Sequence, residues 1–462
     1  MYDVAVIGAG SAGISAVAEI KKTTENFVLI NHGEGGTTCA RVGCMPSKTL
    51  IQIANDFHGR NHFSMTGIIG SEKLKVDSAT VLKYVRKLRD RFVRGVMAET
   101  ARLGNRNIPG FAQFLDPTTL KVNNTIIRAK RIIIATGTTP EFPQKWKKFS
   151  DRIVTTDELF EMNELPESMV IMGLGSVGLE MGQALSRLGV KVTGIGRNKR
   201  LATLSDPIIN AFAKTLLESE FPIELGREAE ILPAKEGLKI TLGDKSFKIK
   251  KVLASLGRQP NLKGLRLEEI GVRFDENDIP IFTKGSLKLS NLPIFLAGDV
   301  NQHRPVLHEA VDDGRIAGFN SVRNNAVVFE RRVPITITFC EPNIATVGLT
   351  YSNLKDQDFI VGEAELDAGR AIILLQKGIL RIYAASRTGV LLGAEMIAPH
   401  GEHLAHLIAC MIQQKMTVFD ALKIPIYHPV MEEGLRDALR NMSKKIKNRR
   451  SSFDLSPVRK NG

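Results

Sequence analysis

The sequence predicts an α/β fold built on parallel sheets. Two distant segments share one pattern: a run of apolar residues, then glycines spaced as GxGxxG, then a helix-forming stretch. The first is YDVAVIGAGSAG near the N-terminus, and the second is SMVIMGLGSVG, which begins at Ser168. A strand that runs through a glycine turn into a helix begins a βαβ unit, and such units build parallel sheets with ligands at the carboxyl ends of the strands. We therefore expect two Rossmann-like dinucleotide-binding domains.

The first fingerprint contains Gly8, Gly10 and Gly13. Gly8 suits the tight turn, Gly10 the close approach of a pyrophosphate, and Gly13 the close packing of helix on strand. The N-terminus of the following helix offers unpaired N–H groups to the phosphates. The next strand ends at Asn31, where an acidic residue would be expected to bind the ribose. Asn31 can still accept a hydroxyl proton, although less strongly than a carboxylate.

The second fingerprint contains Gly173, Gly175 and Gly178. The strand after it ends at Gly196, where an NADH site would hold an acid, and cations follow at once: Arg197, Lys199 and Arg200. A missing acid and added cations favour NADP(H) over NAD(H), the alternative being a solvated basic turn. Two dinucleotide sites so far apart imply two ligands. A flavin with a nicotinamide is the economical pair, because hydride passes readily between them.

The segment GTTCARVGCMPSK places Cys39 and Cys44 five positions apart in a chain with four cysteines. A disulfide between them would need a distorted backbone, because residues five apart in a regular helix lie beyond the roughly 4.4 to 6.8 Å that the Cα atoms require. Strained disulfides are the reducible ones. The spacing alone leaves three interpretations open: two idle thiols, half of a metal site, or a redox-active pair.

Length and composition bound the class of protein. The 462 residues suggest two to four domains of about 100 to 200 residues each. We find no secretory signal and no apolar run of about 18 residues, so we expect a cytoplasmic protein without a membrane segment. The net charge of +14 raises nucleic acid as a partner, but the segment from residue 440 supplies about half of that excess. We expect that basic tail to be solvated and nucleic-acid binding to be absent.

One helical pattern could imitate a metal site. His403, His406 and Cys410 recur at spacings of three and four, so they share a helix face. They lie among a core-facing apolar stripe, and we therefore expect no metal. Cys340 falls in a strand pattern and is expected to be a small buried residue.

Further motifs give the chain a family resemblance. They are RIIIATGTTP, SLGRQPN, LPIFLAGDV, VPITITFCEPNIATVGLT and YHPVMEEG, in that order. Together with the fingerprints and the CxxxxC segment they resemble the class I pyridine nucleotide-disulfide oxidoreductase family over nearly the whole chain. The resemblance implies FAD, a homodimer whose active sites are completed by the other subunit, and electron flow from nicotinamide through flavin to a disulfide. GCMPSK and HPVMEEG look most like dihydrolipoamide dehydrogenases, with lipoamide as substrate.

The resemblance assigns roles to four catalytic residues. Cys44 would lie against the flavin as the charge-transfer thiolate, and Cys39 would be the interchange thiol that meets the substrate. A nearby helix start and a cation should lower the thiol pKa. His428 would be the general acid and base, and Glu433 would orient its imidazole.

Other residues would bind the cofactors. Lys48 would lie near flavin N5 and pair with Glu180, and Asp299 would bind the ribityl chain. The remaining cofactor contacts implied by the resemblance are Ala112, Thr136, Gly137, Gly257 and Gly298. The expected order of domains is a first FAD segment (1–140), a nicotinamide domain (141–265), a second FAD segment (266–332), an α+β dimerisation domain (333–445) and a basic tail (446–462).

Two alternatives to a lipoamide enzyme stay open. The first is an NADPH-dependent reductase of glutathione or another small disulfide, which Gly196 and Arg197 favour; against it, glutathione reductases usually carry lysine where Ser47 lies. Mercuric and large thioredoxin reductases would need an additional C-terminal cysteine pair or selenocysteine, which the tail lacks. The second is a redox-inactive flavoprotein that binds nucleic acid, and the intact Cys39 and Cys44 argue against it.

Overall fold

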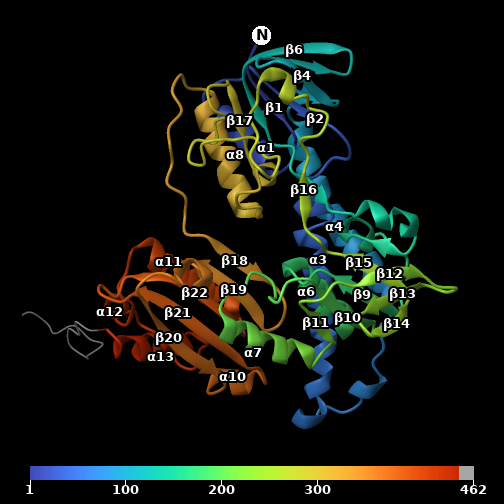
Figure 1. The fold of residues 1–462 in the computed structure, drawn as a ribbon, viewed down its shortest axis with the longest axis vertical. Helices are drawn as coiled ribbons and strands as arrows, with labels where there is room; N and C mark the ends of the chain where they lie inside the picture. The colour runs from blue at the N-terminus through green and yellow to red at the C-terminus, as the bar shows by residue number, and fades with distance from the viewer. Residues whose placement is uncertain (447–462) are drawn as a thin grey trace, which may run out of the picture.

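The structure, a computed structural model, describes residues 1–446 and arranges them in three groups of strands and helices (Figure 1). The group with the N-terminus lies at one end of the molecule, and the other two lie side by side at the opposite end. The predicted tail lies outside the described residues, apart from its first position.

The first group is built on a seven-stranded sheet in the order β3-β2-β1-β6-β5-β4, with β17 also paired to β6. Its strands are β1 (Tyr2–Ile7), β2 (Phe27–Asn31), β3 (Asn107–Pro109), β4 (Ala112–Asp116), β5 (Thr119–Val122), β6 (Thr125–Ile134) and β17 (Ile294–Leu296). Strands β1, β2, β3 and β17 pair in parallel, and β4, β5 and β6 form an antiparallel meander. In β1, Val4, Ala5 and Val6 are all fully buried, as expected for a strand covered on both faces.

Two helices, α1 (Ser11–Ile20) and α8 (Leu307–Ser321), pack closely beside this sheet. Glycines in α8 explain how close they come. A Cβ at Gly314 would lie 2.1 Å from the backbone oxygen of Ala12, and one at Gly318 would lie 2.6 Å from that of Ala16. Only glycine permits this close approach of α8 to α1. With α8 and β17, the chain returns to the first sheet after a long excursion.

The excursion forms the second group, around a parallel sheet in the order β11-β10-β9-β15-β8. Its elements are β8 (Ile153–Val154), α5 (Thr156–Leu159), β9 (Ser168–Met172), α6 (Ser176–Arg187), β10 (Lys191–Gly196), α7 (Pro207–Glu218), β11 (Ile223–Leu225) and β15 (Lys251–Ala254). An antiparallel sheet of β12 (Glu230–Pro233), β13 (Leu238–Leu242) and β14 (Lys245–Ile249) adjoins it. A ribbon of β7 (Thr138–Pro140) and β16 (Arg258–Pro260) connects this group to the first.

The third group is an antiparallel sheet in the order β18-β19-β22-β21-β20, packed with helices. Its elements are β18 (Ile335–Thr338), β19 (Asn343–Gly348), α9 (Tyr351–Leu354), β20 (Phe359–Leu366), α10 (Arg370–Ile373), β21 (Gly378–Ala385), β22 (Leu391–Ala398), α11 (Gly401–Gln413), α12 (Val418–Ala421) and α13 (Glu432–Ser443). A mixed sheet with a parallel centre, a parallel sheet and this α+β unit confirm the predicted fold class.

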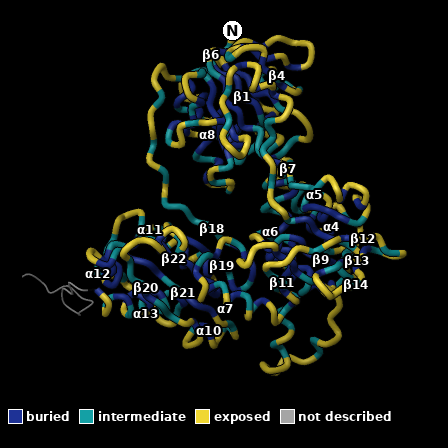
Figure 2. Tube along the Cα trace, viewed as in Figure 1, coloured by how far each residue is buried: buried dark blue, intermediate teal, exposed yellow. Residues whose placement is uncertain are grey.

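The segment after β2 leaves the first group. Helices α2 (Thr38–Arg41), α3 (Cys44–Gly59) and α4 (Ser78–Ala101) follow, and α3 packs against α6, beside which it lies in Figure 1. Leu50, Ile51 and Ala54 of α3 are buried in the same apolar cluster as residues of α6 and β19. Figure 2 shows dark blue, buried segments inside each of the two lower groups and yellow, exposed segments around their edges. The helix that begins at Cys44 therefore lies where three parts of the chain meet.

Candidate active site

The structure brings Cys39 and Cys44 together at the ends of two helices. Cys39 lies in α2, and Cys44 is the first residue of α3. A Cβ at the intervening Gly43 would lie 3.0 Å from the Thr38 oxygen and 3.2 Å from the Cα of Cys39, so glycine allows the tight reversal. Both cysteines are half-buried free thiols, linked by a hydrogen bond between their side chains. The distorted backbone that a five-residue spacing requires is therefore present.

The two thiols differ strongly in acidity. The pKa of Cys44 is lowered to about 7, chiefly because its side chain is hydrogen-bonded to Cys39, with burial opposing and Lys48 contributing. The backbone N–H groups at the start of α3 also favour a thiolate at this position. The same hydrogen bond, followed by burial, raises the pKa of Cys39. Cys44 is thus the sulfur that carries charge near neutral pH.

Lys48 and Glu180 form the predicted pair. Lys48 Nζ lies 2.7 Å from Glu180 Oε2, and the Glu180 side chain is only 4% exposed. The other carboxylate oxygen accepts the backbone N–H of Phe339 at 2.9 Å, while the Lys48 ammonium lies 4.7 Å from the centre of the Phe339 ring. The pair joins α3 to α6 and to the loop after β18.

The first glycine loop has the geometry of a phosphate cradle. Gly8 has φ +109°, and a Cβ there would lie 2.3 Å from the Ala135 oxygen; a Cβ at Gly13 would lie 1.8 Å from the Gly8 oxygen. At Gly10 a Cβ would meet nothing within 4 Å, and this residue begins α1 without a side-chain cap. Gly8 and Gly13 thus allow close packing that a Cβ would block, Gly10 leaves open space, and the uncapped helix start fits a pyrophosphate.

Asn31 supports the glycine loop. Its Oδ1 accepts the backbone N–H of Ala9 at 3.1 Å, and because an amide oxygen has two lone pairs it can also accept from a ribose hydroxyl. The ribose contact of Asn31 stays a prediction, and its amide oxygen also holds the loop that would lie against the pyrophosphate.

Other predicted flavin contacts lie at the strand ends of the first sheet. Thr136 Oγ1 is buried and has no hydrogen-bond partner within the described chain, which fits a polar ligand group. Asp299 follows β17, and burial raises the pKa of its carboxyl, with Arg258 opposing. The other predicted positions are Ala112, buried at the start of β4, and two glycines with positive φ, Gly137 and Gly298.

The second glycine loop repeats the first. A Cβ at Gly173 would lie 2.1 Å from the Ser255 oxygen, and one at Gly178 would lie 1.9 Å from the Gly173 oxygen. Gly175 is open and begins α6 without a side-chain cap. At the end of β10, Gly196 is buried, and the cations that follow it, Arg197 and Arg200, are exposed. Gly257 has φ +115° and its oxygen accepts the N–H of Glu141 at 2.9 Å.

His428 and Glu433 form a pair at the start of α13. The Nδ1 atom of His428 lies 3.1 and 3.0 Å from the two Glu433 oxygens, and this hydrogen bond is the main cause of the lowered pKa of Glu433. The His428 side chain is 77% exposed. With Nδ1 held by the carboxylate, Nε2 is left to meet a substrate. Figure 1 shows α13 apart from α3, so one chain does not bring His428 to the cysteines.

Sequence reasoning missed two arginines of the site. Arg258 donates to Thr138 Oγ1 and to the Thr138 oxygen, both at 2.8 Å. Arg258 directly follows Gly257, which was predicted to contact a cofactor. This neighbouring position is the sequence signal that could have identified Arg258. Arg436 donates to Glu433 at 2.9 Å from one helical turn further along α13, a spacing that the sequence also contains.

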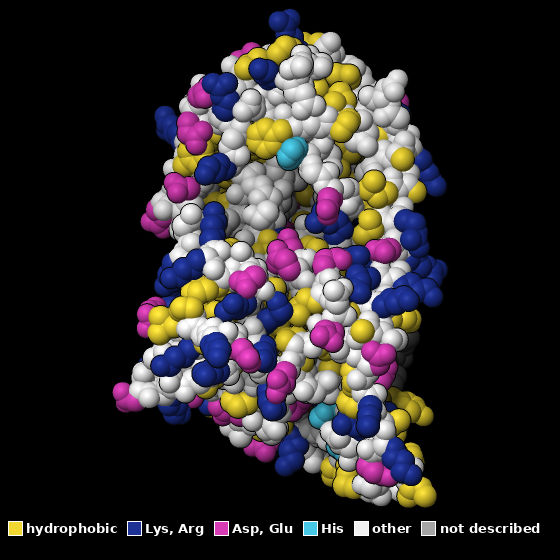
Figure 3. Space-filling model, turned by 90° about the vertical axis from the view of Figure 1, so that its right-hand side faces the viewer, with side chains coloured by type: hydrophobic (Ala, Val, Ile, Leu, Met, Phe, Trp, Pro, Cys, Tyr) yellow, Lys and Arg dark blue, Asp and Glu magenta, His cyan; other side chains and the backbone are white. Residues whose placement is uncertain are grey.

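Residues 1–446 contain no group of three or more His, Cys, Asp or Glu side chains that could hold a metal, and none of their helices is long and apolar enough to cross a membrane. His403, His406 and Cys410 are exposed on α11, whereas Leu404 and Ile408 are buried. Cys340 is fully buried. Figure 3 shows Lys and Arg interspersed with Asp and Glu on the face it displays, without one continuous basic patch.

Comparison with known families gives two matches along the chain. The family described as pyridine nucleotide-disulphide oxidoreductase matches residues 2–314. The dimerisation domain of the pyridine nucleotide-disulphide oxidoreductases matches residues 334–439.

Individual relatives carry two different names. A mercuric reductase from Lysinibacillus sphaericus is 28% identical over 459 residues, covering 96% of this chain and 83% of that protein. A dihydrolipoyl dehydrogenase from Thermus scotoductus is 30% identical over 461 residues, covering 96% of this chain and 98% of that protein. Among solved structures, the HOCl-induced flavoprotein disulfide reductase RclA from Escherichia coli superposes with a TM-score of 0.82 at 22% identity, covering 96% of this chain and all of that one.

Proposed function

We propose that this chain, which belongs to the class I pyridine nucleotide-disulfide oxidoreductase family, oxidises dihydrolipoamide through Cys39 and Cys44 and passes the electrons to FAD and a nicotinamide. The observation that carries the proposal is the asymmetry of the two thiols. Cys44 begins a helix and has a pKa of about 7, and the pKa of Cys39 is raised. The predicted domain division is part of the same proposal.

The residues around the first sheet fit FAD. Gly10 and the uncapped start of α1 would hold the pyrophosphate, and Thr136 and Asp299 would contact the rest of the flavin chain. When bound, FAD supplies the two-electron exchange between the nicotinamide and the disulfide. Lys48 would place its ammonium near the flavin, where a positive charge stabilises added electron density.

The protein's own groups then account for thiol exchange. A substrate thiolate attacks the Cys39 sulfur of a Cys39–Cys44 disulfide; the S–S bond breaks and Cys44 leaves as the thiolate, which its low pKa favours. The second substrate thiol gives its proton to His428, and its sulfur displaces Cys39. The substrate leaves as a disulfide, and Cys39, whose pKa is raised, takes the proton back.

The exposed position of His428 supports sharing of the site between two subunits. Glu433 holds Nδ1 and leaves Nε2 facing outward, so a second copy of the chain would supply His428 to the cysteines of the first. The match to a dimerisation domain over 334–439 supports the same arrangement.

An NADPH-linked reductase of glutathione or another small disulfide is the second candidate. It is favoured by the end of β10, where Gly196 lacks a carboxylate and Arg197 and Arg200 are exposed. These cations would bind a 2′-phosphate, and we propose NADP(H) as the nicotinamide for either substrate.

The test is steady-state turnover of lipoamide, glutathione disulfide and Hg(II) with NADH and NADPH in parallel. We expect lipoamide to be the preferred substrate and NADPH the preferred nicotinamide. Turnover of glutathione disulfide or Hg(II) without lipoamide would replace the substrate assignment. Flavin reduction with no disulfide turnover at all would refute the redox role of the cysteines.

The nicotinamide preference has its own variant. Replacing Arg197 by Glu should raise KM for NADPH about 10- to 100-fold, because a charge-assisted hydrogen bond contributes about 1.5 to 3 kcal/mol. KM for NADH should change little. Arg273→Glu, at an exposed arginine outside the second group, is the matched control. Equal effects on the two nicotinamides would contradict a phosphate contact at Arg197.

A further inference from the structure

One face of α6 joins the cysteine helix to the third group. Glu180, Gln183 and Arg187 are spaced three and four residues apart, so they line one side of the helix. Glu180 binds Lys48 of α3 and the backbone of Phe339, as described above. Gln183 accepts the N–H of Glu341 at 2.7 Å and donates to the oxygen of the same residue at 2.7 Å. Glu180 and Gln183 therefore both connect α6 to the loop between β18 and β19.

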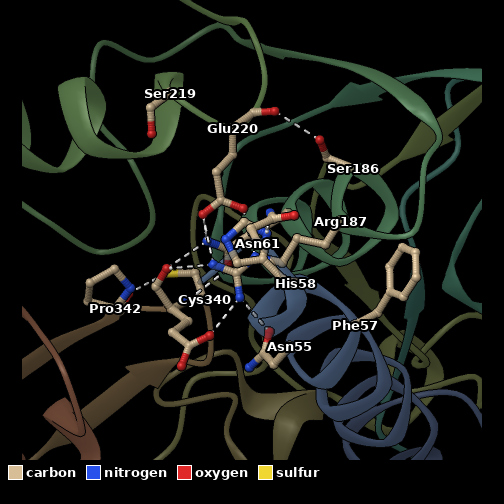
Figure 4. Close-up of polar contacts among 12 residues, drawn as sticks. Asn55, Phe57, His58, Asn61, Ser186, Arg187, Ser219, Glu220, Cys340 and Pro342 are labelled. Carbon is tan, nitrogen blue, oxygen red and sulfur yellow. Dashed lines mark hydrogen bonds and ion pairs between the residues drawn. The ribbon is translucent and has the colours of Figure 1, made fainter. Parts of the chain in front are cut away.

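Arg187 is the most heavily bonded of the three. Its side chain is 4% exposed, and Nε and Nη2 donate to the two oxygens of Glu220 at 2.7 and 2.8 Å. Nη1 donates to Glu341 Oε2 at 2.6 Å and to Asn55 Oδ1 at 2.7 Å. Figure 4 shows the guanidinium at the centre of these groups, with Asn55 reaching it from α3. A single buried cation thus links all three parts of the chain.

The two contacts between α3 and α6 are in register. Lys48 and Asn55 are seven residues apart on α3, and their partners, Glu180 and Arg187, are seven residues apart on α6. Equal spacing in the same chain direction means that the helices run parallel. Seven residues span about 10 Å, so the bridges hold α3 at two points two turns apart. Two such points fix both the sliding and the rotation of α3 on α6.

We propose that Arg187 is a positioning residue, which through Asn55 keeps α3 in register with α6 and so holds the Lys48 ammonium against Glu180 beside Cys44. The inference rests on the proposed function for the role of Cys44. Glu220 and Glu341 neutralise Arg187, and its contact with the cysteine helix is the neutral amide oxygen of Asn55.

The consequence of losing this bridge can be followed along α3. With the far end of the helix released, Lys48, whose side chain is 35% exposed, would turn toward water and leave the buried Glu180 carboxylate unpaired. A more distant cation and an unpaired anion both disfavour a nearby thiolate, so the pKa of Cys44 should rise. The pKa of the neighbouring His58 is lowered, first by burial and then by the charge of Arg187, so its imidazole does not favour a charged form beside this network.

The test uses Asn55, because its replacement leaves both acidic partners of Arg187 in place. Asn55→Leu removes the acceptor, and Asn55→Asp keeps an acceptor oxygen. Both would be made in the full-length FAD-containing protein with Cys39→Ser, and the long-wavelength thiolate-to-flavin absorption of Cys44 would be titrated with pH. We expect Asn55→Leu to raise the midpoint by about half a pH unit, a threefold loss of thiolate below the pKa. Asn55→Asp should restore the parent midpoint.

A matched control separates positioning from general interdomain stability. Arg381 is also half of an ion pair between the second and third groups, 2.6 Å from Asp206, but it makes no contact with α3. Arg381→Met should lower the thermal midpoint without moving the titration. The proposal would be overturned if Asn55→Leu left the titration midpoint of Cys44 unchanged, or if Arg381→Met raised that titration midpoint equally. Pseudo-first-order alkylation of Cys44 against pH gives a second readout that does not depend on flavin absorption.

The outcome is independent of the substrate assignment. Neither titration uses a disulfide or a nicotinamide, so a protein that fails to turn over lipoamide can still show the expected rise in Asn55→Leu. Conversely, an active lipoamide enzyme whose Cys44 midpoint ignores Asn55 would keep the proposed function and lose the positioning role of Arg187.

Discussion

Replacing Cys39 by alanine should make Cys44 a much weaker acid. The hydrogen bond between the two sulfurs is the largest cause of the lowered Cys44 pKa, ahead of the favourable charge of Lys48, and burial acts against both. Alanine removes the hydrogen bond while the helix start and Lys48 remain. Serine at the same position keeps a donor hydroxyl and is the matched control.

The size of the effect follows from the two ionisation states. With a pKa of about 7, half of Cys44 is thiolate at pH 7. With the ordinary cysteine pKa of about 8.5, about 3% would be thiolate, so the thiolate fraction should fall about 15-fold. Because the lost hydrogen bond stabilises the thiolate form of Cys44, the titration midpoint of Cys44 moves to higher pH. The reactivity of its sulfur near neutral pH therefore falls.

Alkylation of the single remaining active-site thiol, followed by mass spectrometry over pH 5 to 10, measures that midpoint. We expect Cys39→Ser to titrate near the parent value and Cys39→Ala to titrate at least one pH unit higher. If both variants titrated together near pH 7, the hydrogen bond would not control Cys44, and the helix start with Lys48 would have to account for its acidity.

Four further substitutions test other parts of the site. Glu433→Gln should lower kcat about 100- to 10,000-fold at unchanged thermal stability, because His428 loses the carboxylate that orients and stabilises its charged form. Gly178→Ala should lower the thermal midpoint, because its Cβ would lie 1.9 Å from a backbone oxygen. Gly175→Ala, with open space around its Cβ, should leave the midpoint unchanged and raise KM for the nicotinamide. Lys48→Met should raise the pKa of the adjacent thiol, measured by the same alkylation profile.

The glycine loops could be predicted from sequence because their geometry is local. In both loops a Cβ on the first glycine would meet a backbone oxygen of a neighbouring strand end, at 2.3 Å for Gly8 and 2.1 Å for Gly173. In both, a Cβ on the third glycine would meet the oxygen of the first, at 1.8 Å for Gly13 and 1.9 Å for Gly178. The same spacing meets the same steric demand twice, so a sequence pattern is enough to locate it.

The contacts between groups could not be predicted in this way. Asp206 and Arg381 are 175 residues apart, and no local pattern selects one partner over the many other charged residues. Asn31 shows the same limit over 22 residues: its place after β2 suggests a ribose contact, which stays a prediction, but gives no sign that its oxygen also accepts the N–H of Ala9. The cysteine pair was recognisable because other motifs accompanied it, whereas Arg187 belongs to no motif and its role follows from three-dimensional contacts.

The parallel register of α3 and α6 explains why the cysteine helix needs firm anchoring. Two parallel helices place their N-terminal partial charges, each about half a positive charge, side by side at the end that carries Cys44 and Gly175. This field stabilises a thiolate and a bound pyrophosphate, but the aligned dipoles repel each other when both sites are empty. Glu180 lies on α6 facing that end, and its ion pair with Lys48 draws the helices together there. The Lys48–Glu180 ion pair therefore both offsets the repulsion between the helices and sets the charge beside Cys44. A change in the register of α3 on α6 would alter the helix attraction and the local charge together.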